Sequence, residues 1–311
     1  MLKCSPQSCW PAAAALMRSA MHRQVTRFLM MCVALGSAFA QTQPTFDFVE
    51  IRFPGAMTTN ATGINNFGSI VGSYSIDGHS THGYKLTNKQ FQTINFPGAN
   101  NTFVHGIDNN GDVVGFFTFP GDQKLHGFLR LRNGTFRRLD FPGAFEGTIP
   151  SGVNDALKVV GAFDNNAFTW QNGAFHQINV KDPAGTSGTT RLNGIANTGW
   201  IAGGAVNFGD VRGFIVKGSD FDWLSPQGTF TEAEGINGHG DVVGCSQNGA
   251  YIAFNPEAGE TTGEAEKFPT IFPIILPGKQ TICAFAINYF RAIVGSYTDA
   301  QGLHAFMAVT H

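Results

Sequence analysis

The sequence predicts an all-β protein: a six-bladed β-propeller of four-stranded blades, with its N-terminal strand completing the last blade. Two observations lead to this prediction. A Gly-Ile-Asn motif recurs six times at spacings of 41 to 51 residues, as propeller blades do. The 311 residues include 39 Gly and 29 Phe and only 14 % charged residues, a composition that favours short strands and tight turns over helices.

Two fixed glycines mark the first two strands of each repeat. The first belongs to the motif and is alanine in the sixth copy: Gly63, Gly106, Gly152, Gly194, Gly235 and Ala286. The second stands nine residues later in every copy: Gly72, Gly115, Gly161, Gly203, Gly244 and Gly295. The turns between them are rich in Asn, Asp and Gly, which tolerate positive φ. Five of six motifs end in Asn or Asp, which points to a shared turn-capping role.

A small residue followed by an aromatic marks the third strand, as in Gly127-Phe128. The fourth strand carries an aromatic, an aliphatic three residues later and an apolar residue or Pro after two more, as in Phe136-Leu139-Phe141. The sixth copy ends before this strand, and residues 46–53 supply the pattern instead, so we expect them to pair with residues 303–309. The predicted repeats are about 63–105, 106–151, 152–193, 194–234, 235–285, and 286–311 with 46–62.

Residues 1–40 have the pattern of a signal peptide, with Met21 as a possible start, and 41–311 form the single predicted propeller domain. Basic residues precede an apolar run, which ends in an Ala-x-Ala cleavage pattern at Ala38-Phe39-Ala40. The run is too short to span a membrane. We therefore expect a secreted protein, extracellular or periplasmic. The remaining chain has an excess of acidic groups, which argues against a nucleic-acid partner.

Cys245 and Cys283 are the two cysteines outside the signal segment. A pair in an exported protein is a disulfide candidate, and we expect it to join blades five and six near the axis; two free thiols are the alternative. The sequence has no zinc-ligand spacing, P-loop, dinucleotide fingerprint or Gly-x-Ser-x-Gly elbow. The run 108–112 only faintly resembles a calcium loop, and the sister copies lack its acids. No metal, cofactor or catalytic residue is predicted.

The recurring motifs resemble the HAF-repeat family of bacterial extracellular repeat proteins. They are Gly-Ile-Asn-Asn-x-Gly-x-Ile-Val-Gly, then His-Gly-Phe or His-Ala-Phe, then Phe-x-x-Ile-x-Phe-Pro-Gly-Ala, and they cover residues 46–311. The family's His-Ala-Phe is literal only at His304-Ala305-Phe306, and Arg212-Gly213-Phe214 departs from it. The resemblance implies an exported, propeller-like protein and no defined activity.

The longer, variable loops between the second and third strands are the predicted binding face. Five of six contain an aspartate: Asp77, Asp122, Asp164, Asp210 and Asp299. In four blades a His or Arg begins the third strand: His82, His126, Arg212 and His304. The structural interpretation is turn chemistry, with each His or Arg bonded to a neighbouring blade. The functional one is a ring of carboxylates and imidazoles around the central opening that binds a cation or sugar hydroxyls. His105, on an innermost strand, is either packed or faces the channel.

The predicted function is a non-enzymatic binding or scaffold module, a monomer whose polar loop face binds an extracellular glycan or protein. The alternative is a propeller-type polysaccharide hydrolase or lyase with its site in the central pocket. A scaffold presents only repeat-related residues, whereas an enzyme needs an asymmetric cluster of acid and base groups at the axis. The segment 255–281 departs from the repeat and is interpreted as an elaborated loop of blade five, with a partner-docking insert as the alternative.

Overall fold

The computed structural model describes residues 43–180, 188–207, 210–224, 230–255 and 271–311. The predicted signal peptide and most of the 255–281 segment lie outside these residues. The unit from Pro44 to His311 contains six four-stranded antiparallel sheets, as the sequence predicts. Among the described residues, no helix has the length and apolar character needed to cross a bilayer.

We number the blades one to six, starting with the blade that contains β2. Strands at the same position in their blades share sequence features. The innermost strands are β2 (Thr58–Ile64), β6 (Asn101–Ile107), β10 (Thr148–Val153), β14 (Thr189–Ile195), β18 (Thr231–Ile236) and β22 (Gln280–Ile287). The second strands are β3 (Ile70–Ser75), β7 (Val113–Thr118), β11 (Val159–Phe163), β15 (Ile201–Asn207), β19 (Val242–Ser246) and β23 (Ala292–Asp299). The third strands are β4 (His82–Thr87), β8 (His126–Arg130), β12 (Asn166–Gln171), β16 (Asp210–Lys217), β20 (Gly249–Ala253) and β24 (Gly302–Thr310). The outer strands are β5 (Gln90–Ile94), β9 (Phe136–Arg138), β13 (Ala174–Ile178), β17 (Asp220–Trp223), β21 (Ile271–Pro273) and β1 (Phe46–Ile51).

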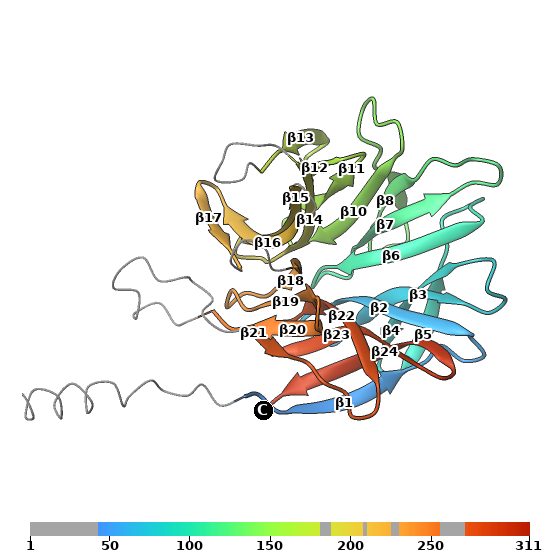
Figure 1. The fold of residues 1–311 in the computed structure, drawn as a ribbon. Coiled ribbons are helices and arrows are strands. Elements are labelled where there is room, and N and C mark those ends of the chain that lie inside the picture. The colour runs from blue at the N-terminus through green and yellow to red at the C-terminus, as the bar shows by residue number, and fades with distance from the viewer. Residues whose placement is uncertain (1–42, 181–187, 208–209, 225–229, 256–270) are drawn as a thin grey trace, which may run out of the picture. The chain divides into compact units, whose positions relative to one another are not determined.

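The six blades form a ring around one axis (Figure 1). Each innermost strand contacts the innermost strands on either side, and β22 contacts β2, so the ring is continuous. The hydrophobic core is divided into six clusters, and each lies between two adjacent blades. One cluster, for example, packs Val71 and Ile94 of blade one against Val104 and Phe117 of blade two. Burial of apolar surface between blades therefore stabilises the ring while leaving the axis open.

Blade six combines the two ends of the described unit. Strand β1 is antiparallel to β24, with Phe46 opposite Thr310 and Ile51 opposite Ala305. The N–H of His311 also donates to the carbonyl oxygen of Thr45 at 3.0 Å. The outer strand of this blade thus comes from the N-terminal side and the other three from the C-terminal side.

A β-bulge just before the first motif position, which is glycine in five blades and Ala286 in blade six, interrupts all six innermost strands. The bulge leaves one residue per blade unpaired, and such a residue is re-aimed relative to a regular strand. The motif glycine is needed because the innermost strands approach closely: a Cβ on Gly63 would lie 2.7 Å from the carbonyl oxygen of His105 in the next blade. The repeated glycine thus reflects packing around the axis.

Phe-Pro-Gly-Ala segments connect the outer strand of one blade to the innermost strand of the next. In blade one, the N–H of Ala99 donates to the carbonyl oxygen of Phe96 at 3.1 Å, and Gly98 has φ 78°, as a type II turn requires. The Phe96 ring stacks on Phe117 of blade two with centroids 3.7 Å apart. The same stack recurs at Phe53–Tyr74 and Phe141–Phe163.

Candidate functional site

The predicted loop aspartates mostly cap their own loops. The carboxylate of Asp77 accepts the N–H groups of His79 and Ser80, both at 2.8 Å. These bonds, chiefly the one from Ser80, hold the pKa of Asp77 well below its usual range. Asp122 and Asp299 likewise each accept an N–H two residues on at 2.8 Å. This is the Asx-turn chemistry of the structural interpretation.

Asp164 and Asp210 complete the predicted aspartates. Asp164 has φ 46°, and its carboxylate accepts N–H groups of the loop before β10, from Phe145 at 3.1 Å and Glu146 at 2.8 Å. It therefore fastens a neighbouring loop. The backbone of Asp210 pairs with Asn207 at the start of β16, and its side chain lies outside what the structure describes.

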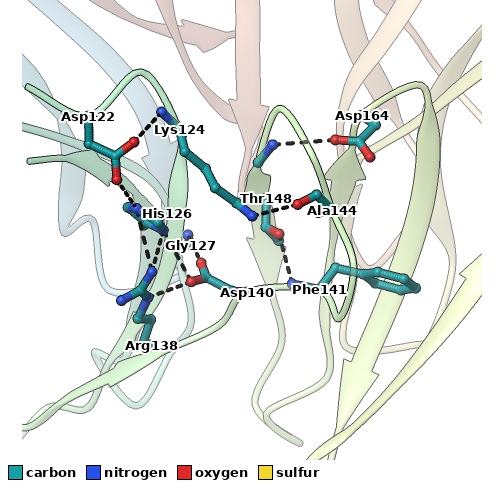
Figure 2. Close-up of polar contacts among 11 residues, drawn as sticks. Asp122, Lys124, His126, Gly127, Arg138, Asp140, Phe141, Ala144, Thr148 and Asp164 are labelled. Carbon is teal, nitrogen blue, oxygen red and sulfur yellow. Dashed lines mark hydrogen bonds and ion pairs between the residues drawn. The ribbon is translucent and has the colours of Figure 1, made fainter.

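His126 lies in the most connected polar cluster of the predicted face (Figure 2). Its ring is 3 % exposed, with Nε2 3.0 Å from Asp122 and Nδ1 3.1 Å from Asp140. Arg138 pairs with Asp140 and also contacts the ring. Figure 2 shows these groups packed between the loop and the outer strand of blade two. The imidazole joins elements of one blade, so little of it is available to a ligand.

The other third-strand starts make equivalent contacts. His304 is 3 % exposed, with Nε2 2.9 Å from Asp299 and 3.2 Å from Arg52. Beside His304, Glu50 pairs with Arg52. The equivalent positions of blade two hold Arg138 and Asp140, so the acidic and the basic residue are exchanged. His82 Nδ1 lies 3.3 Å from the Asn95 side-chain oxygen.

Arg212 is the departure from His at this position. Its guanidinium lies 4.4 Å from the ring centroid of Trp223, on the outer strand of its own blade. The polar contacts described for His82, His126 and His304 thus come from the blade's own loop and outer strand, not from the neighbouring blade that the structural interpretation expected; β1 supplies the outer strand for blade six.

The larger central cavity lies at the opposite ends of the innermost strands, where the first-to-second-strand turns meet. It has a volume of about 310 Å³. None of the predicted loop residues with described side chains lines it. Its walls come from residues just after the motif isoleucine in every blade, among them Asn66, Asn109, Asp155, Asn197 and Tyr289. We call this cavity the turn-side mouth. The sequence predicts these turns to be structural and gives no sign of the cavity.

The turn-capping role predicted for the motif Asn is confirmed. Asn65 Oδ1 accepts the N–H groups of Phe67 and Ser69, each at 3.0 Å, and Nδ2 donates to the backbone of the next blade. The residue after the motif Asn or Asp makes a second set of hydrogen bonds between adjacent blades. The N–H of Asn66 donates to Asn109 Oδ1 at 2.9 Å, and that of Asn109 to Asp155 Oδ1 at 2.9 Å. These bonds fix a row of amides and one carboxylate around the mouth.

The rim of the mouth combines hydrogen-bonding groups with an aromatic ring. Blades two to four contribute Asn109, Asp155 and Asn197. On blade six, Tyr289 lines the cavity and is 48 % exposed, and blade one contributes Asn66. Gly238 of blade five has no side chain to continue the row of amides. The Tyr289 ring thus shares the rim with the hydrogen-bonding groups of the other blades.

A second, smaller cavity of about 70 Å³ lies further along the channel. The residues at the bulges line it: Thr62, His105, Ser151, Asn193, Glu234 and Phe285. Burial raises the pKa of Glu234 to about 8, with a contribution from the Glu232 carboxylate, and burial lowers the pKa of His105 to about 4. His105 lines this cavity and also packs on the Phe116 ring, with centroids 5.2 Å apart, so it combines the two positions that the sequence left open. We call this cavity the inner chamber.

Cys245 and Cys283 form a disulfide beside the inner chamber, with Cα atoms 4.7 Å apart. It joins β19 of blade five to β22 of blade six, the position expected from the sequence. Glu234 lies close to both sulfur atoms. Because the two sulfurs are bonded to each other, they do not offer thiolate ligands to a metal.

The sequence analysis also overlooked a repeated threonine. Thr102 Oγ1 accepts the N–H of Phe96 at 3.0 Å, which ties the innermost strand to the end of the preceding outer strand. Equivalent side chains bond at Thr59, Thr148, Thr190 and Thr231. The signal is a threonine four residues before the motif glycine in five of six copies.

No protein-family model matches this chain, and no curated protein matches it. Among solved structures, a virginiamycin B lyase from Staphylococcus aureus is 11 % identical over 85 % of this chain and 99 % of its own, with a TM-score of 0.47. A lectin from Aleuria aurantia is 8 % identical over 84 % and 97 %, with a TM-score of 0.42. AofleA from Arthrobotrys oligospora is 12 % identical over 88 % and 94 %, with a TM-score of 0.41. At this level of similarity these likenesses carry no argument about function.

Proposed function

We propose that this protein is an exported binding module of the HAF-repeat type that binds a glycan at the turn-side mouth. The observation that carries the proposal is the composition of the rim, where Tyr289 of blade six lines the same cavity as Asp155 and Asn197 of blades three and four. Sugar rings have an apolar face that packs on aromatic side chains and an edge of hydroxyls that bond to amides and carboxylates. A volume of about 310 Å³ suits a small ligand or the end of a chain.

The ligand site is preorganised by the bonds described above. Asp155 Oδ2 accepts the side-chain amides of Asn109 at 2.9 Å and Asn197 at 2.6 Å, so three blades hold one carboxylate in place. The ring of His239 packs on Tyr289 with centroids 4.1 Å apart. Groups already held in their bound arrangement lose little entropy when a ligand arrives.

A glycan array with the purified protein, followed by calorimetry on the best sugar, tests the proposal. We expect Tyr289→Ala and Asp155→Asn each to weaken binding by about tenfold or more, the usual effect of removing a central contact. Phe145→Ala is the matched control, because Phe145 is 87 % exposed but lies on the other face, in the loop before β10. Equal losses in all three variants, or no sugar bound by the unaltered protein, would refute the proposal.

A hydrolase or lyase acting on polysaccharide is the second candidate, and Glu234 is the observation in its favour. Its carboxyl, with a pKa raised to about 8, lies at the axis in a chamber whose residues differ from blade to blade. The chamber of about 70 Å³, however, has room for an ion or a few water molecules, each taking on the order of 30 Å³, and not for a sugar ring. Product release from polysaccharides that is lost in Glu234→Gln would establish this candidate in place of the binding module.

A further inference from the structure

The floor of the turn-side mouth differs in chemistry from its rim. It is a ring of six aliphatic side chains, the second residue of each motif: Ile64, Ile107, Val153, Ile195, Ile236 and Ile287. The same six residues line the inner chamber, so the ring separates the two cavities. Five of them are only 5–7 % exposed, so most of each side chain packs between blades. Only the tips reach the axis, where they line the cavities. A ligand seated in the mouth therefore meets apolar atoms below and polar atoms around it.

We infer that the glycan recognised at the turn-side mouth carries an acetamido group directed down the axis, as in N-acetylhexosamines. This inference rests on the proposed function and specifies its ligand. An acetamido group has a methyl, one N–H donor and one carbonyl acceptor. The ring of six aliphatic side chains suits the methyl, the Asp155 carboxylate accepts the N–H, and the amide groups of Asn109 and Asn197 donate to the carbonyl.

A plain hexose places a hydroxyl where the acetamido group would stand. A hydroxyl pointing at six aliphatic side chains loses its hydrogen bonds to water and gains no partner there. The structure thus favours the N-acetylated sugar through both its methyl and its amide.

The test compares N,N'-diacetylchitobiose with cellobiose by calorimetry, because the two β-1,4-linked disaccharides differ only at the acetamido positions. Burial of one methyl group favours the acetylated sugar by about fourfold, and satisfied amide hydrogen bonds raise the preference to about tenfold or more. Equal affinity for the two sugars would overturn the inference while leaving the glycan-binding function in place. Binding of neither sugar, with no other glycan bound, would refute the function itself.

Val153→Thr is the variant that probes the ring, because the side chains have the same shape and differ by one hydroxyl. We expect it to reduce the preference for diacetylchitobiose by about threefold to fivefold, because a methyl contact is lost and the new hydroxyl offers a partner to the hexose hydroxyl. A thermal unfolding curve of the variant checks that the fold is retained. If Val153→Thr weakens both disaccharides to the same extent, the ring does not read the acetamido group, and the inference fails.

Discussion

Blades one to three and blades five and six are joined to their neighbours in different ways. In the first group, an aromatic ring of each blade stacks on a phenylalanine from the Phe-Pro-Gly-Ala turn that leads into that blade, as Phe117 of blade two does on Phe96. Between blades five and six the Cys245–Cys283 disulfide makes the connection. The features that break the repeat gather in the second group: Gly238, Tyr289 and Glu234 are all there. Departures from the repeat thus add an aromatic ring and a buried carboxyl group at the axis, whereas blades two to four supply amides and the Asp155 carboxylate there.

Among the changes that test this comparison, removal of the disulfide is expected to have the largest effect on the free energy of unfolding. A bridge across 38 residues stabilises the fold by about 4 kcal/mol in the chain-entropy model. The Cys245→Ser/Cys283→Ser double variant should lose about that much free energy of unfolding, measured by urea denaturation. A reducing agent should destabilise the unaltered protein equally and leave the variant unchanged. A loss below about 1 kcal/mol would show that packing alone joins blades five and six.

Truncation of the aromatic stack should have the next largest effect. Phe96→Ala removes a half-buried ring and is expected to cost about 3 kcal/mol. The matched control is Val180→Ala between blades three and four, where an aliphatic Val180 follows the outer strand and contributes to the core cluster shared with Ala205. It should cost about 1.5 kcal/mol, since two carbons are lost. Equal costs in urea denaturation would mean that the stacks add nothing beyond burial.

Asp108→Asn should have the smallest effect on the free energy of unfolding, and it should raise this free energy where the other changes lower it. Burial raises the pKa of Asp108 to about 6, and its side chain is 3 % exposed. Because the folded pKa exceeds the unfolded value of 3.8, the folded state binds more protons between them, and stability falls as pH rises from about 4 to about 6. Asn removes this cost, so we expect a gain of about 1–2 kcal/mol at pH 7 that disappears near pH 4.

Asn65→Asp is the matched reverse change at the same position of blade one. It introduces a buried carboxylate and removes the Nδ2 donor that bonds to the carbonyl oxygen of Asp108 at 3.0 Å. It should therefore destabilise the protein, and more at pH 7 than at pH 4. Thermal unfolding at the two pH values measures both variants. Gains or losses independent of pH would show that the charge of Asp108 does not matter.

Nearly all of the fold was predictable because every blade repeats the same packing problem. The motif glycines follow from the close approach of the innermost strands, and residues 46–53 carry the outer-strand pattern missing after Phe306. Position in the repeat predicted the order of strands. It also predicted the pairing of Cys245 with Cys283, since both lie near the axis on adjacent blades.

The candidate site was harder to predict, since it depends on how equal positions of six blades meet. Asp77 and His126 stood out by residue type, yet their side chains bond within their own blade. Asn109 and Asp155 looked like ordinary turn residues, and only the ring brings them together at one cavity. A bulge in each innermost strand aims Glu234 and its counterparts at the channel, and a bulge leaves no clear mark in sequence.

The antiparallel pairing of β1 with β24 also determines how the molecule responds to mechanical force. Phe46 and Thr310 lie opposite each other, so a pull on both ends of the described unit acts at one end of the strand pair. Hydrogen bonds between antiparallel strands run perpendicular to the strands, so such a pull loads them one after another, beginning at Phe46. The two strands would unzip at low force instead of shearing together, and blade six would open before any other.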